Sequence, residues 1–206
     1  MSAAPGSRRI ALFGGTFDPP HNAHLALARL ALDELQLDEL RWVLAGQPWQ
    51  KTRAVTAAAQ REAMVRLAMA AAGPEPRFRL ERCELEREGP SYTLDTVREL
   101  QAAGPAATWF LLIGADQYAS LHTWRDWPEL LSRVNLAVAQ RPGVLAQPDA
   151  ALLQFPHRAV ALPMMDISST EIRAQVARGE PVAELVPAEV ARYIDQHALY
   201  SASSAR

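Results

Sequence analysis

The sequence predicts an α/β protein with a doubly wound, mostly parallel, Rossmann-like sheet and a small C-terminal helical part. Strand-like and helix-like segments alternate over most of the 206 residues, which is typical of parallel strands joined by right-handed crossovers. The apolar runs at 10–13 and 108–113 each end at a glycine, and polar motifs follow them. Ligands in such folds bind beyond the carboxyl ends of the strands, so these motifs are candidate site residues.

The expected strands are short and apolar. The segment at 108–113 is apolar after Thr108 and predicts a buried strand, whereas 77–83 alternates and predicts a partly exposed one. The strand segments are residues 8–13, 39–44, 77–83, 108–113, 134–140 and 158–162. A turn is expected at 141–143 and a loop over 144–157, where prolines recur.

The expected helices have an apolar period near 3.6 residues. In the helix that begins near Asn22, this period places Leu25, Ala28, Leu32 and Leu35 on one face. Residues 118–131 fit a helical hairpin that packs on the sheet with Trp127 in the core. The other helices are expected at 56–72, 91–103, 169–178 and 187–197. We expect one domain over 1–206, with frayed termini at 1–7 and 201–206.

Composition excludes several classes of protein. The net charge of −2 gives no electrostatic case for nucleic-acid binding, and no apolar run approaches the ~20 residues of a membrane span. The N-terminus lacks the apolar segment of a secretory signal, and one cysteine, Cys83, excludes an internal disulfide framework. We therefore expect a cytoplasmic protein, and the oligomeric state stays open.

Residues 13–24 (FGGTFDPPHNAH) combine a glycine turn, a helix start and two histidines. Backbone N–H groups, a helix N-terminus and imidazoles together can hold a polyphosphate. The glycines could instead make only a tight turn, and His21 and His24 could be structural. Neither G-x-x-x-x-G-K-[ST] nor G-x-G-x-x-G is present, and the other histidines form no ligand-spaced cluster, which argues against a zinc site.

Four motifs carry a resemblance to a known family. Residues 14–24 (GGTFDPPHNAH) resemble the G-G-T-F-D-P-x-H-x-G-H signature of the bacterial nicotinate-nucleotide adenylyltransferases, members of the H-x-G-H nucleotidyltransferase superfamily. Residues 91–96 (SYTLDT), 114–124 (GADQYASLHTW) and 167–173 (ISSTEIR) resemble the S-Y-T-x-D-T, G-x-D-x-x-x-x-L-x-x-W and I-S-S-T-x-I-R motifs of that family. In order and spacing, the resemblance covers roughly residues 8–200.

The resemblance implies transfer of AMP from ATP to nicotinate mononucleotide, which gives deamido-NAD and pyrophosphate in NAD biosynthesis. The attacking phosphate is already ionised, so catalysis should depend on alignment and on charge neutralisation. Mg²⁺ would arrive with ATP and be held mainly by phosphate and water oxygens, with no metal ligands from the protein.

The resemblance also implies an ATP site. His21, His24 and Arg173 would stabilise the transferring phosphates, and the C-terminal helices from about 167 would complete the site. Ser168-x-x-Glu171 is also a plain capping box, and Asp116, expected near the substrate ribose or Mg²⁺-bound water, could instead cap a helix. The remaining implied ATP contacts are Gly14, Gly15, Thr16, Phe17, Ser168, Ser169 and Thr170.

On the acceptor side, the resemblance makes Trp124 the ring that stacks on the pyridine, although it could simply be a core residue. Thr93, with backbone groups around Leu94 and Arg125, would receive the nicotinate carboxylate. Backbone N–H donors favour a carboxylate over a carboxamide, which brings its own NH₂.

Two departures from the family pattern matter. Ala23 replaces the glycine of H-x-G-H, and we expect its methyl to crowd the space nearest the phosphates without closing the site. The family loop P-P-H-K/R reads Gln-Pro-Trp-Gln-Lys at 47–51. This places weight on Lys51, the only lysine among 21 basic residues, as a catalytic phosphate ligand, and leaves Trp49 either covering the substrate or packing under the loop.

Two alternatives stay open at this point. A related nucleotidyltransferase could use nicotinamide mononucleotide or pantetheine phosphate as the acceptor. Ala23 and the missing loop histidine would also fit a nucleotide-binding regulator that does not catalyse.

Overall fold

The protein is described here by a computed structural model covering residues 7–48, 54–104, 106–140, 148–161, 163 and 165–201. Six strands form one sheet in the order β3-β2-β1-β4-β5-β6. Every pairing between them is parallel, which confirms the α/β prediction and makes the described sheet wholly parallel. The strands are β1 (Arg8–Gly15), β2 (Glu39–Leu44), β3 (Phe78–Glu81), β4 (Ala107–Gly114), β5 (Asn135–Gln140) and β6 (His157–Ala161).

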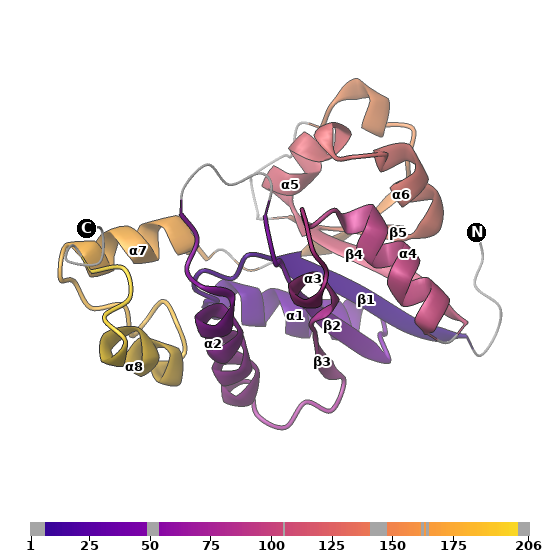
Figure 1. Cartoon of the computed structure of the whole chain (residues 1–206). Helices are drawn as coiled ribbons and strands as arrows, with labels where there is room; N and C mark the ends of the chain where they lie inside the picture. Colours follow the sequence, from indigo (N-terminus) through magenta and orange to yellow (C-terminus); the bar gives the residue numbers. More distant parts are fainter. Residues whose placement is uncertain are drawn as a thin grey trace.

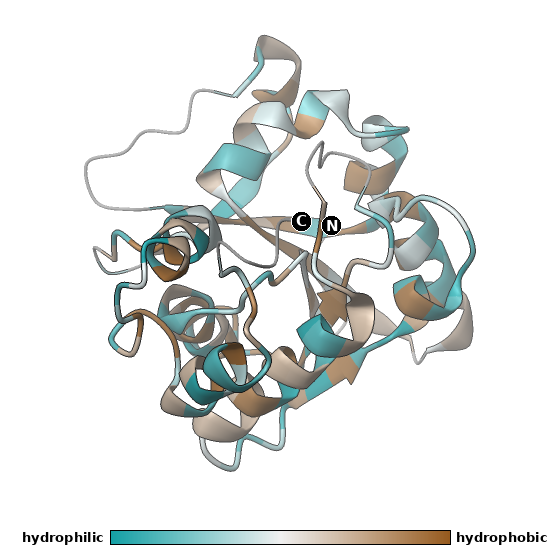
Figure 2. Ribbon diagram, turned by 60° about the vertical axis from the view of Figure 1, so that its left-hand side comes forward, coloured by the Kyte–Doolittle hydropathy of each residue, from teal (hydrophilic) through white to brown (hydrophobic). Residues whose placement is uncertain are grey.

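Helices cover both faces of the sheet (Figure 1). One face packs against α1 (Asn22–Glu34), α2 (Ala58–Ala71), α7 (Ser169–Ala177) and α8 (Ala188–Gln196). The other face packs against α3 (Cys83–Glu86), α4 (Thr93–Ala103), α5 (Ala115–Ser120) and α6 (Trp127–Arg133), with short 3₁₀ turns at Leu121–Thr123 and Ala150–Leu152. Along these helices hydrophobic and hydrophilic residues are interspersed, as Figure 2 shows.

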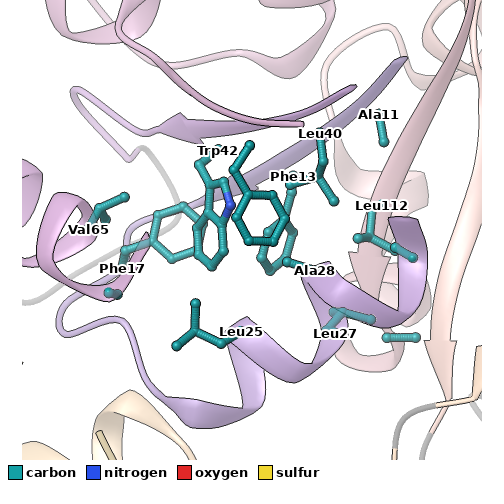
Figure 3. Packing of buried hydrophobic residues seen from close by; sticks show 14 of the residues in the cluster. Ala11, Phe13, Phe17, Leu25, Leu27, Ala28, Leu40, Trp42, Val65 and Leu112 are labelled. Atoms are coloured by element: carbon teal, nitrogen blue, oxygen red, sulfur yellow. The ribbon is translucent and has the colours of Figure 1, made fainter. Parts of the chain in front are cut away.

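The alternation of side chains along β1 builds a core on each face. Ala11 and Phe13 join the cluster beneath α1 and α2, whereas Ile10 and Leu12 join the cluster beneath α4 and α6. In the first cluster, Phe13, Phe17 and Trp42 lie together above the α1 helix (Figure 3). Both faces of the central strand are therefore buried, as expected for a doubly wound sheet.

The strand order reverses between β1 and β4. The chain runs outward from β1 to β3, then returns to place β4 on the other side of β1. The first strands of the two halves end at Gly15 and Gly114, which are the glycines that end the apolar runs in the sequence. A crevice opens at such a switch point.

The structure adjusts several expected boundaries. β1 continues through Gly15, which pairs with Leu44. The strand expected at 77–83 covers only Phe78–Glu81, because the chain turns into the four-residue helix α3. The expected hairpin at 118–131 is α5, a 3₁₀ turn and α6, and the turn at 141–143 lies outside the described residues. Within the described part of the chain, no helix is long and apolar enough to cross a bilayer.

Candidate active site

A cavity of about 420 Å³ lies at the switch point. The loop after β1 and the start of α7 form one side of its wall, and the start of α4 and the segment after β4 form the other. The cavity collects most of the residues expected at the site from separate parts of the chain. Those that line it are Gly14, Gly15, Thr16, Phe17, His24, Thr93, Leu94, Asp116, Trp124, Arg125, Ser169, Thr170 and Arg173.

The two glycines of the β1–α1 loop differ in what surrounds them. A Cβ built on Gly14 would meet no atom of the described residues within 4 Å, so these residues leave the position open toward the cavity. A Cβ on Gly15 would lie 2.8 Å from Cζ of Phe17. The Phe17 ring is packed against Phe13 at a centroid distance of 5.5 Å, and its backbone has a positive φ of 47°. Gly15 is therefore required for packing, whereas Gly14 leaves room for a ligand.

His21 and His24 stack at the start of α1, with ring centroids 3.6 Å apart. The backbone N–H of His21 donates to Nδ1 of His24 at 3.2 Å. Burial, and secondly the neighbouring His21, hold the pKa of His24 well below its usual value. The His24 ring is therefore neutral at pH 7, and because Nδ1 accepts a hydrogen bond, its proton lies on Nε2. His24 lines the cavity, whereas His21 is 6% exposed and lies outside its wall.

The N-terminus of α7 is joined to the β1–α1 loop by side chains. Oγ of Ser169 donates to the carbonyl of Pro19 at 2.9 Å, and Nη1 of Arg173 donates to the carbonyl of Asp18 at 2.7 Å. Nη2 of Arg173 donates to Oγ1 of Thr170 at 3.1 Å. These contacts bring residues about 150 positions apart in the sequence into one wall.

Ser168 caps α7. Its Oγ accepts the backbone N–H of Glu171 at 3.1 Å, as the capping-box pattern predicts. The Glu171 carboxylate pairs with Arg178 at 3.1 Å. Ser168 does not line the cavity, so the structure gives it a capping role.

The other side of the wall is the start of α4 together with Trp124 and Arg125. The N–H groups of Thr93 and Leu94 lie in the first turn of α4, where an α-helix offers no internal acceptors. The Trp124 side chain packs against the α4–α6 core, and its Nε1 is buried without a hydrogen-bond partner among the described residues. The Arg125 guanidinium lies 4.8 Å from the centroid of the Tyr92 ring.

Two further expected residues, Asp116 and Ala23, can be placed in the structure. Asp116 lies in the first turn of α5, is exposed and lines the cavity. Ala23 is 5% exposed within α1 and does not line the cavity. Its methyl therefore does not crowd the ligand space as the sequence led us to expect. Lys51 and Trp49 lie outside the described residues.

Several buried polar side chains around this cavity were not predicted as functional residues from the sequence. Asp18 is 1% exposed, and its Oδ1 accepts the Tyr200 hydroxyl at 2.7 Å. Burial, followed by the Asp18 charge and hydrogen bond, raises the pKa of Tyr200. Burial also raises the pKa of Glu84, which lines the cavity and accepts the Thr96 hydroxyl at 2.7 Å. The position of Asp18 within the glycine-histidine motif was the only sequence signal among these.

Comparison with known proteins identifies the family of this chain. The cytidylyltransferase-like family profile matches residues 12–175. A "Probable nicotinate-nucleotide adenylyltransferase" of Methylibium petroleiphilum is 52% identical over 98% of this chain and 96% of its own length. A protein of the same name from Streptomyces coelicolor is 45% identical, with 91% of this chain and 98% of its own length covered.

Solved structures show the same fold. The Plasmodium falciparum nicotinic acid mononucleotide adenylyltransferase complexed with NaAD superposes with a TM-score of 0.78, at 18% identity, over 94% of this chain and 97% of that chain. The extent and identity of the sequence matches show the family. The chain belongs to the nicotinate-nucleotide adenylyltransferases, nucleotidyltransferases of NAD biosynthesis within the cytidylyltransferase-like family.

Proposed function

We propose that the cavity binds ATP against the β1–α1 loop and α7, and nicotinate mononucleotide against α4 and Trp124. AMP transfer between them would give deamido-NAD and pyrophosphate. The observation that carries this proposal is that one cavity joins the glycine-histidine loop to a helix N-terminus beside an indole ring. The carboxyl ends of the strands at a switch point are where such folds bind nucleotides.

On the ATP side, the phosphates lie over Gly14, where the protein leaves space for them. The neutral His24 ring donates its Nε2–H to a phosphate oxygen, and His21 supports His24 by stacking on it. Thr16, Ser169 and Thr170 lie around the same wall. With Gly15 and Phe17, they form the ATP half, which α7 completes.

Arg173 supplies positive charge on the ATP side of the cavity. Its guanidinium is half-buried in the cavity wall and held by Asp18 and Thr170. We assign it to the β- and γ-phosphates, whose charge increases as pyrophosphate leaves. Lys51 stays a prediction for the same task.

On the acceptor side, the nicotinate carboxylate accepts hydrogen bonds from the N–H groups of the first α4 turn and from the Thr93 hydroxyl. The positive end of the helix dipole favours a carboxylate over a neutral amide there. The Trp124 ring covers the pyridine, and Arg125 lies beside it.

The protein aligns two charged groups and reduces the repulsion between them. Mg²⁺ carried by ATP would neutralise charge on the phosphates. In the described ranges, no three His, Cys, Asp or Glu side chains gather as cation ligands. The exposed Asp116 carboxylate, which lines the cavity, would hold water molecules bound to such an ion. A cytoplasmic location and a single functional unit over 1–206 stay predictions.

Pyrophosphate release tests the acceptor assignment. The enzyme is mixed with Mg-ATP and either nicotinate mononucleotide or its amide at equal concentration. We expect faster release with the acid. Equal or faster release with the amide would overturn the acceptor assignment, and no release with any mononucleotide would favour a non-catalytic regulator.

His24→Ala tests the phosphate half. Loss of one preorganised donor to a developing charge lowers kcat by about 100- to 1000-fold. His197→Ala is the matched control, because His197 is exposed at the end of α8 and its ring lies beside that of Tyr193. Equal kcat in the two variants would remove His24 from the mechanism.

A further inference from the structure

Arg61 is a buried arginine to which the proposed chemistry assigns no role. It lies in the first turn of α2, and its side chain is among the largest that are fully buried, at 2% exposure. Arginine is rarely buried to this extent unless its guanidinium is fully engaged. Its contacts therefore indicate what the position does.

The guanidinium donates to four main-chain carbonyls from three segments. Nε donates to Thr56 at 2.8 Å, Nη1 to Thr16 at 3.0 Å and to Ala45 at 2.8 Å, and Nη2 to Gly46 at 3.4 Å. Thr16 belongs to the proposed ATP half, and Ala45 and Gly46 follow β2 directly. One rigid, planar group thus fixes the ATP loop against the segment after β2.

The same segment is joined to the acceptor half on its other side. Oγ of Ser91 accepts the N–H groups of Gly46 at 3.0 Å and of Gln47 at 3.1 Å. The N–H of Ser91 in turn donates to the carbonyl of Gln47 at 3.0 Å. Ser91 lines the cavity two residues before Thr93.

Between these two attachments, Gly46 packs closely against α3. A Cβ on it would lie 2.0 Å from the carbonyl oxygen of Glu84, so its backbone lies directly on α3. Hydrogen bonds on both sides of this closely packed segment thus connect Arg61 to Ser91.

We infer that Arg61 is a positioning residue for adenylyl transfer, which sets the ATP loop and the mononucleotide half at a fixed separation. The inference rests on the proposed function. In-line transfer requires the attacking phosphate and the α-phosphate to be aligned, and a misplacement of about 1 Å can cost a factor of about 100 in rate. Lysine keeps the charge of Arg61, but its single ammonium cannot reach four carbonyls spread around a planar fork.

The test compares kcat and both KM values, per folded enzyme, for Arg61→Lys, Ser91→Ala and Val190→Ala. Arg61→Lys should raise KM for ATP and for the mononucleotide by about tenfold each and lower kcat, because ordering of both halves is lost. Ser91→Ala should raise KM for the mononucleotide more than KM for ATP. Val190→Ala, which truncates a fully buried residue of α8, should lower thermal stability and leave both KM values unchanged.

A purely structural Arg61 would behave like Val190, with lower stability and unchanged KM values, and that result would overturn the inference. If Arg61→Lys does not fold, Gly46→Ala replaces it, because its Cβ displaces the same segment while Arg61 stays intact. Unchanged KM values in Gly46→Ala would overturn the inference equally. Turnover by the wild type and by Val190→Ala tests the proposed function separately, since it does not depend on Arg61.

Discussion

The hydrogen bond between Tyr200 and Asp18 ties the C-terminal end of the described chain to the glycine-histidine loop. The hydroxyl donates to Oδ1 at 2.7 Å across 182 positions of sequence. Asp18 is 1% exposed, so water cannot replace the hydroxyl readily, and its Oδ2 accepts the Thr56 N–H at 3.4 Å. We therefore expect Tyr200→Phe to destabilise the protein.

The magnitude follows from the charge of the acceptor. A hydrogen bond to an ionised group contributes roughly 1.5–3 kcal/mol. For a protein of about 150–250 residues, each kcal/mol shifts Tm by about 2–4 °C, so Tyr200→Phe should lower Tm by roughly 3–12 °C. The ring stays in place and no cavity forms, which keeps the loss within this range.

Urea and thermal unfolding measure this loss. Tyr193→Phe is the matched control, since Tyr193 lies in α8 with its ring beside His197. If Tyr200→Phe lowers the unfolding free energy no more than Tyr193→Phe does, the hydrogen bond to Asp18 does not stabilise the protein as described. A second readout is pH: because the pKa of Tyr200 is raised, its stabilising effect is complete below pH about 10 and is lost as the pH rises above that value. The difference between wild type and Tyr200→Phe should therefore narrow in strong alkali.

Three further predictions concern the candidate site. Ser168→Ala should cost about 1 kcal/mol in urea unfolding because the α7 cap is lost; an unchanged midpoint would contradict the capping role. Gly15→Ala should lower the unfolding free energy by about 1–3 kcal/mol, because the new Cβ clashes with Phe17. Gly14→Ala should keep the stability and raise KM for ATP. The reverse pattern would contradict the assignment of the open space at Gly14 to the phosphates. His24→Asn should reduce the fall in unfolding free energy between pH 7 and pH 5. In the wild type, His24 of the unfolded chain binds a proton below its ordinary pKa of about 6.5, while folded His24 stays neutral, so stability falls with pH. Parallel pH profiles for the two proteins would show that His24 titrates normally when folded.

The sequence predicted the strands that are buried on both faces better than the edges of the sheet. The run at 109–113 is apolar throughout, so hydrophobic burial alone identifies β4. At Arg77–Cys83 the pattern could not show where the strand ends, because α3 depends on tertiary contacts and is too short for a helical period. Periodicity reports burial and carries little information about turns made by non-local contacts.

The site residues were likewise predictable only where local sequence patterns indicate them. Residues such as His24 and Thr93 were predictable because they follow strands or begin helices in recognisable motifs. Arg61 was not, because its acceptors are main-chain carbonyls contributed by distant segments. A lone arginine in an amphipathic helix is ordinarily a solvated residue, and only the packing shows otherwise. Ala23 illustrates the converse, since the burial of its methyl within α1 could not be derived from its position in the motif.

A crystal structure with bound deamido-NAD would directly test the assignment of the two halves of the cavity, because this molecule would occupy both halves at once. Our account predicts the pyridine against Trp124, its carboxylate at the N–H groups of the first α4 turn, and the phosphates between Gly14 and His24. A dinucleotide bound in the opposite direction, or outside this cavity, would contradict the assignment of the two halves.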